Sequence, residues 1–244
     1  MKIDHSFLTI SEIVSKDIRT AEVFSKYGID YCCGGNVKLI ELCRSNNIDL
    51  FTLSQELESV QYSPLDDSLD FASWKLDQLI NYIVDTHHSY IVQASELLIS
   101  LCLKVSQAHG SLHPELIKIR ELVLSLLEEL SSHMNKEERV LFPYALILIN
   151  SDRTGDRFPV SGLNNASNPI HIMESEHETV GHILQQIEDL SNHYNIPEDA
   201  CASYRLLYNK LKELQADIHQ HVHLENNILF PGIIKLENKI LEWA

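Results

Sequence analysis

The chain has 244 residues, of which 44% are hydrophobic, and its formal net charge is −16 at pH 7. This length and apolar content are sufficient for one sizeable core and a small second domain. The acidic balance argues against nucleic acid and anionic membranes as partners, because both are bound mainly through lysine and arginine. No apolar run reaches the roughly 18 to 20 residues of a membrane span, and residues 1–5 lack the basic and apolar regions of a secretion signal. We therefore expect a cytoplasmic protein.

The cysteine and histidine counts point away from a disulfide scaffold and toward metal. Five cysteines, an odd number that includes the adjacent pair Cys32-Cys33, do not resemble the paired framework of a secreted protein, so we expect reduced thiols. Thirteen histidines are an unusual number for this length. Neutral imidazole is the commonest protein ligand of metals.

Residues 1–60 are predicted to form a small helical domain that carries the adjacent thiols. Thr9-Ile-Ser-Glu12 is a capping-box pattern that begins a helix. After Cys32-Cys33, two glycines permit a tight turn, and Asn36 is expected to cap a helix that reaches about Ser45. Thiols at a helix start have a lowered pKa and are suited to redox or sulfur chemistry. The alternative is that both are small buried apolar side chains at a turn.

Residues 61–73 are polar, contain Pro64 and show no sustained period, so we predict a linker. From residue 74 to 244, apolar residues recur at spacings of three and four in four long stretches, which predicts four amphipathic helices. The predicted buried faces of the second and fourth helices include Val140 and Ile228.

Two of these helices contain the same pattern, His-x3-Glu-x4-Phe-Pro, at residues 133–143 and 221–231, with an offset of 88 residues. In a helix, positions i and i+4 lie on one face, so each copy directs an imidazole and a carboxylate toward one point. The other two helices each place one histidine, His87 or His177, on the apolar line. The repeated unit is therefore a helical hairpin, and two hairpins form an up-down-up-down four-helix bundle. Because proline lacks an N–H, each helix should kink or end at Pro143 or Pro231.

A single histidine on an apolar face is usually a satisfied core residue, but the complete set requires a different explanation. Burying unpaired carboxylates costs several kcal/mol, and a pair of cations would compensate them. Four imidazoles and two carboxylates fit two metal ions with bridging glutamates and open positions for oxygen, nitric oxide or an oxo bridge. This ligand set favours non-haem iron, although zinc and manganese remain open. The candidate ligands are His87, His133, Glu137, His177, His221 and Glu225.

Several neighbouring residues compete for these roles. His88 is rotated off the apolar line by one residue, and His219 and His223 fall on another face of their helix, so we expect them to be solvated or to support the ligands. Glu129 and Glu176 are candidates for hydrogen bonding to ligands or for relaying protons. The alternative is that both are surface acids.

Four segments of the chain resemble a known family: Tyr31-Cys-Cys-Gly-Gly35, Glu128-Glu-Leu-Ser-Ser-His133, Met173-Glu-Ser-Glu-His177 and Leu224-Glu-Asn-Asn-Ile-Leu-Phe-Pro231. They are similar to the ScdA/YtfE/DnrN iron-sulfur cluster repair di-iron proteins, which carry a small N-terminal domain and a hemerythrin-like domain. The resemblance covers essentially the whole chain. It implies an all-α fold in which the four histidines and two bridging glutamates named above hold an oxo-bridged iron pair. One departure is local: Thr86-His87-His88 stands where the family is expected to have Tyr-His-Asp, and helical phase favours His87 as the ligand.

The resemblance also implies a function, the repair of iron-sulfur clusters damaged by oxidative or nitrosative stress, through iron donation or nitric oxide chemistry. The implied partners are damaged iron-sulfur proteins and nitric oxide or oxygen, with a homodimer as one candidate assembly. Other functions stay open: an oxygen- or nitric oxide-binding or sensing protein like the hemerythrins, a nitric oxide reductase, and a dinuclear zinc hydrolase. The residues themselves establish no catalytic class.

Overall fold

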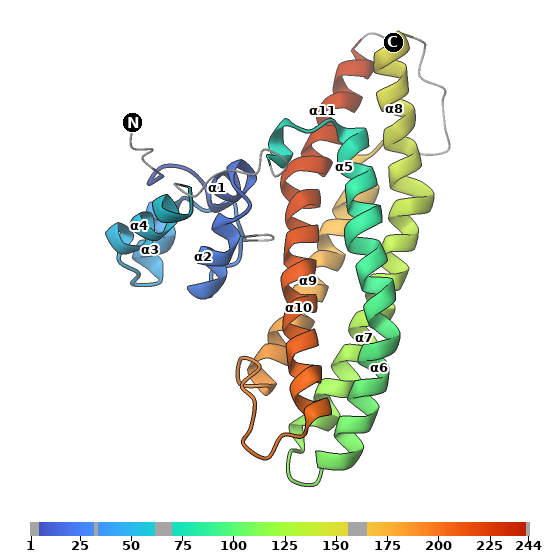
Figure 1. Cartoon of the computed structure of the whole chain (residues 1–244). Helices are drawn as coiled ribbons and strands as arrows, with labels where there is room; N and C mark the ends of the chain where they lie inside the picture. The colour runs from blue at the N-terminus through green and yellow to red at the C-terminus, as the bar shows by residue number, and fades with distance from the viewer. Residues whose placement is uncertain (1–4, 32–33, 62–69, 156–164, 243–244) are drawn as a thin grey trace.

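The computed structural model describes residues 5–31, 34–61, 70–155 and 165–242. It confirms an all-α protein: the described residues contain no β-strand, and one isolated antiparallel bridge joins Thr9 and Lys38. Figure 1 shows a small helical domain beside a long four-helix bundle.

The small domain consists of four short helices whose ends follow local sequence signals. Thr9 makes the predicted capping box, because its side chain accepts from the Glu12 N–H and the Glu12 carboxylate accepts from the Thr9 N–H. The second helix is followed by Gly28, whose φ of +66° lies in the left-handed region that glycine adopts without strain. The helices are α1 (Ile10–Lys16), α2 (Thr20–Lys26), α3 (Leu39–Ser45) and α4 (Leu50–Gln61).

The predicted helix start at Asn36 is wrong. Helix α3 begins at Leu39 with Lys38 as its N-cap, so a non-helical segment follows the two glycines. Gly35 accepts a hydrogen bond from the Ser11 N–H through its carbonyl, and a Cβ at Gly35 would lie 2.6 Å from the carbonyl oxygen of Tyr31. The close approach of the chain to α1 therefore requires this glycine.

The bundle contains four long helical columns, three of which are interrupted by a π-helical turn. The first column is preceded by the short 3₁₀ turn η2 (Phe71–Ser73). The columns are α5 (Leu76–Tyr82), η3 (Ile83–His88) and α6 (Ser89–His109); α7 (Glu115–Lys136), η4 (Glu137–Leu141) and α8 (Phe142–Thr154); α9 (Ser167–Leu190); and α10 (Ala202–Leu224), η5 (Glu225–Leu229) and α11 (Phe230–Leu241).

The repeated prolines do not end their helices. Each follows a π turn and occupies the first turn of the next α segment, α8 or α11, so the hydrogen bond that proline lacks falls where the helix changes from π to α pairing. The helical path is thus interrupted before Pro143 and Pro231 and then continues. Helix α8 extends to Thr154 and ends at Gly155, whose φ of +74° lies in the left-handed region.

The bundle interior has a polar layer between two apolar ones. In every column the buried histidines or glutamates of this layer fall between residues of two separate hydrophobic clusters, as between Ile83 and Ile91 in the first column and between Met173 and Val180 in the third. Within the described residues, the helix Leu76–His109 is long and apolar enough to cross a membrane by length and composition alone. Core helices of bundle proteins meet the same criterion.

A buried carboxylate fixes the end of the bundle beyond the polar layer. Glu237 on α11 accepts from the Tyr144 hydroxyl of α8 and, at 2.9 Å, from the Ala166 N–H at the start of α9. Three columns are therefore joined through one side chain.

We expect Glu237→Ala to lower the free energy of unfolding by about 1–3 kcal/mol, because it removes the buried acceptor shared by the Tyr144 hydroxyl and the Ala166 N–H. Urea denaturation followed by circular dichroism measures the loss. Glu242→Ala, at an exposed position near the same end, is the control and should change stability by less than about 0.5 kcal/mol. Equal effects of the two substitutions would contradict this role.

Candidate metal centre

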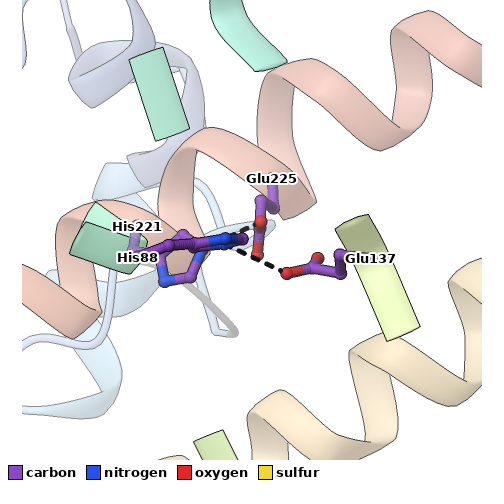
Figure 2. A group of neighbouring side chains, drawn as sticks. All are labelled: His88, Glu137, His221 and Glu225. Atoms are coloured by element: carbon purple, nitrogen blue, oxygen red, sulfur yellow. Dashed lines mark hydrogen bonds and ion pairs between the residues drawn. The ribbon is translucent and has the colours of Figure 1, made fainter. Parts of the chain in front are cut away.

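Two groups of four side chains converge in the polar layer. The ligand atoms of each group all lie within 4.8 Å of one another, and all the residues are buried. The first group is His88, Glu137, His221 and Glu225, drawn in Figure 2, and the second is His133, Glu137, His177 and Glu225. Both glutamates belong to both groups, so the two groups form one centre.

In the first group, the Nε2 atoms of His88 and His221 lie 3.2 Å apart. Glu225 places Oε1 2.9 Å from the His221 Nε2, and Glu137 places Oε2 3.3 Å from the His88 Nε2. The three columns that supply these residues thus direct nitrogen and oxygen atoms to one point (Figure 2).

The second group repeats this arrangement with the other oxygens of the same glutamates. The Nε2 atoms of His133 and His177 lie 3.0 Å apart, Glu225 Oε2 is 3.1 Å from the His177 Nε2, and Glu137 Oε1 is 3.4 Å from the His133 Nε2. Each carboxylate therefore directs one oxygen to each group, which is the geometry of a bridging ligand.

The residues fit a pair of cations by two independent tests. Nitrogen ligands about 2.1 Å from one ion and at right angles to each other would be about 3.0 Å apart, close to the spacing of both histidine pairs. Both Glu137 oxygens and Glu225 Oε2 are buried without a hydrogen-bond partner among the described residues. Buried carboxylates without donors need a compensating positive charge.

The charges within the cluster favour the same interpretation. Burial opposes the charged form of Glu225, but His221 and His177 outweigh it and hold the pKa of Glu225 well below its usual range. Burial likewise opposes protonation of His133, but Glu137 raises its pKa to about 9. Glu225 therefore retains its charge, and a bound cation would take the place of the proton on His133.

His88 and His177 occupy equivalent positions in the two hairpins. The His177 Nδ1 lies 2.8 Å from Asn226 Oδ1, and the His88 Nδ1 lies 2.8 Å from Glu138 Oε1. Glu138 and Asn226 each directly follow the shared glutamate of their hairpin. Both rings also stack on the repeated phenylalanine, His177 on Phe230 and His88 on Phe142.

The structure brings His88, and not the predicted His87, into the cluster. Helical phase placed His87 four residues after the buried Ile83, but this segment is the π turn η3. In a π turn, i and i+5 are paired, which places His88 in line with Ile83. The His87 side chain is buried beside the cluster, with Nδ1 2.9 Å from Asp217 Oδ1 and its ring parallel to that of His221.

Of the two acids predicted to support the ligands, Glu176 contacts a cluster histidine, whereas Glu129 is exposed. The Glu176 carboxylate lies 2.9 Å from the His133 Nδ1 and also accepts from Lys136, so it orients a candidate ligand. Glu129 lies on the exposed face of α7. Its counterpart in the repeat, Asp217, instead contacts His87.

Sequence reasoning did not identify three residues that contact the buried histidines, although the repeat contains a signal for them: Glu138, Asn226 and Asp217. Glu138 and Asn226 share the 88-residue offset and directly follow the two glutamates. Asp217 precedes His221 by four residues and therefore lies one turn away on the same helix.

His223, expected to be solvated or supporting, is fully buried where the bundle meets the small domain. Its Nδ1 lies 3.3 Å from the carbonyl oxygen of Tyr31 and its Nε2 3.4 Å from the Ser15 hydroxyl. The Tyr31 ring contacts the rings of both His219 and His223. Burial lowers the pKa of His223 to about 4. Cys32 and Cys33 lie outside the described residues, but Tyr31 directly precedes them.

Comparisons with known proteins match both parts of the chain. Residues 79–233 match the family model described as hemerythrin HHE cation binding domain, and residues 8–61 match the ScdA_N model, described as a domain of unknown function. The chain is 31% identical over 223 residues to the iron-sulfur cluster repair protein ScdA of Staphylococcus haemolyticus, covering 91% of this chain and 95% of the relative. It is 32% identical over 219 residues to the iron-sulfur cluster repair protein YtfE of Yersinia pestis, covering 90% and 93%.

We expect Glu176→Gln to weaken metal binding by about 10- to 100-fold, since it removes the charge that holds the Nδ1 of His133. Competition with a chromophoric chelator measures the affinity. Glu129→Gln, one turn before His133 but exposed, is the matched control and should leave the affinity unchanged. If both substitutions had the same effect, Glu176 would not act through His133.

We also expect metal removal to destabilise the bundle, because both shared carboxylates then lose their compensating charge. At free metal 100 times the dissociation constant, binding to the folded state alone contributes about 2.7 kcal/mol. Thermal denaturation of metal-loaded and chelated protein measures the difference. An unchanged melting temperature would show that the cluster is stable without a cation.

Proposed function

Because the chain belongs to the hemerythrin HHE cation-binding family and, over about nine-tenths of its length, to the family of the repair proteins ScdA and YtfE, we propose that it repairs iron-sulfur clusters damaged by oxidative or nitrosative stress. The observation that carries this proposal is the buried six-residue cluster in which two carboxylates each face two histidine pairs. The names of the relatives supply the biological role, and the cluster supplies the chemistry.

The proposed cofactor is a pair of non-haem iron ions with an oxo bridge. The donor set of four imidazoles and two bridging carboxylates suits iron and leaves positions for a small ligand. When bound, such a pair would supply iron or electrons and a binding position for nitric oxide or oxygen. The proposed ligands are His88, His133, Glu137, His177, His221 and Glu225, with His88 in place of the His87 chosen from helical phase.

The protein's own residues would hold and orient this centre. Glu138, Glu176 and Asn226 contact the Nδ1 atoms of three of the histidines, which directs each Nε2 into the site. Apolar clusters lie on both sides of the layer and its six cluster residues are buried, and electrostatic interactions in such an interior are stronger than in water.

The small domain is proposed to act on the same centre through Cys32 and Cys33. Tyr31 directly precedes these thiols, and its carbonyl oxygen contacts His223, two residues after His221 on α10. Ser15 of α1 contacts the other nitrogen of this histidine. We propose the domain limits 1–60 and 74–244 with a linker at 61–73, which the two matched segments support.

The proposed partners are damaged iron-sulfur proteins, with nitric oxide or oxygen as small ligands and a homodimer as the assembly to test. A cytoplasmic location is proposed because buried free thiols, as at Cys43 and Cys102, are typical of a reducing compartment.

We expect the iron-loaded protein to restore activity to a [4Fe–4S] enzyme inactivated by nitric oxide, and His133→Ala to abolish this effect, because the substitution removes a ligand. Enzyme activity after incubation with loaded, chelated and substituted protein measures repair. Free iron at the same concentration is the control. Equal recovery with free iron would contradict the proposal.

The same preparations distinguish other functions. Full repair by Cys32→Ala/Cys33→Ala would remove the thiols from the mechanism and favour a binding or sensing module. Repeated consumption of nitric oxide with an electron donor would indicate a nitric oxide reductase. A colourless protein that contains zinc would indicate a hydrolytic centre.

A further inference from the structure

One buried histidine of the first column has no part in the centre as described. His87 is 1% exposed, its Nδ1 lies 2.9 Å from Asp217 Oδ1, and its Nε2 is buried without a hydrogen-bond partner among the described residues. A carboxylate on one imidazole nitrogen, with the other nitrogen free, is the usual arrangement of a metal-binding histidine. His87 is thus oriented as a ligand is, although it lies outside the cluster.

His87 also lies beside the first group and not the second. Its ring is parallel to that of His221, with centroids 5.5 Å apart and an interplanar angle of 5°. The Nε2 of the neighbouring His88 lies 3.2 Å from the Nε2 of His221. Two successive histidines on one helical turn therefore flank the same ligand.

The backbone between Ile83 and His88 determines which of the two enters the cluster. In the π turn, pairing of i with i+5 places His88 in line with the buried Ile83. In an α-helical turn, pairing of i with i+4 would place His87 there instead. A shift of one residue in register thus exchanges the two side chains. Each already has a carboxylate for its Nδ1, Glu138 for His88 and Asp217 for His87.

We propose that His87 and His88 are alternative ligands of one metal position, exchanged by a one-residue shift in the register of the turn Ile83–His88. The proposal rests on the metal centre put forward above and concerns its regulation. The other position has no such pair, because Glu176 and Glu178 flank His177 and helix α9 is continuous from Ser167 to Leu190. One metal position therefore has an exchangeable ligand and the other a fixed one.

Because of this asymmetry, the two metal positions would have different roles in the proposed repair function. During the exchange, the position bound by His88 and His221 has one imidazole fewer, whereas the position bound by His133 and His177 keeps both. The first position would therefore release its ion or accept an incoming ligand, and the second would keep its ion. The register shift is the step that would control release of the ion or entry of a ligand at the first position.

The test is the metal content of purified protein loaded anaerobically with iron(II), measured by inductively coupled plasma mass spectrometry. We expect two ions per chain in the wild type, in His87→Ala and in His88→Ala, because either histidine serves the first position. The double variant His87→Ala/His88→Ala should retain one. His177→Ala, which has no neighbouring histidine, should also retain one and is the matched control.

A second pair of variants tests the role of the Asp217 contact. Asp217→Ala alone should keep two ions, because His88 remains in place. In the His88→Ala background, Asp217→Ala should reduce the content to one, because His87 then lacks the acceptor that orients its Nδ1. Such dependence on the background is the signature of coupled residues. Circular dichroism establishes that each variant is folded, and His88→Gln repeats the test with a polar side chain.

Three outcomes would overturn the exchange. Loss of an ion in His88→Ala alone would show that His87 does not replace it, and loss in His87→Ala alone would make His87 a fixed ligand. Retention of both ions in the double variant would show that neither histidine is required. If the wild type itself does not bind two ions, the proposed centre fails instead of the exchange.

Discussion

Two carboxylates with no exposure to solvent are the constraint on which the rest of the bundle depends. Glu137 and Glu225 lie at the centre of a helical core, and without a positive partner each would cost several kcal/mol. Four buried histidines are arranged around them, and Glu138, Glu176 and Asn226 hold three of these histidines in turn. The small domain contacts this same region through Tyr31 and His223. The fold is thus built around two buried carboxylates, three of whose four oxygens have no hydrogen-bond partner among the described residues.

The π turns are the local backbone features that allow the helices to direct their ligand side chains toward the two buried carboxylates. Two of them begin at the shared glutamates and the third ends at His88. Each adds one residue to a helical turn, so the side chains on either side of the metal layer can face inward at different phases. π turns are uncommon in helices and often occur at functional sites. Here they also accommodate the repeated prolines without ending the helix.

Much of the architecture could be predicted from the sequence, because both the apolar period and the His-x3-Glu repeat are visible in it. The π turns could not be predicted, because one extra residue in a helical turn does not visibly change an apolar pattern with spacings of three and four. This is why the predicted buried face included Val140 and Ile228, whereas the structure buries Leu141 and Leu229. The same offset of one residue explains why helical phase indicated His87, whereas the structure brings His88 into the cluster.

Contacts between segments that are far apart in the chain could also not be predicted from the sequence. The burial of His223 depends on Ser15 and Tyr31, about 200 residues away, and no periodicity in α10 reveals them. The helix start predicted at Asn36 failed for a similar reason. The adjacent segment pairs with α1 through Gly35 and Ser11, and this tertiary contact determines where the next helix begins.

The sharing of both carboxylates between the two groups has a consequence for charge balance. One divalent cation would balance the two shared carboxylates, and a second would bring two further positive charges into a layer between apolar clusters. The carboxylates of Glu138 and Glu176 contact ligand histidines, but both are partly exposed, so water screens their charge and they compensate a buried cation less fully. We therefore expect a small anion to accompany a second cation, and the affinity for that cation to vary with the anions present in solution.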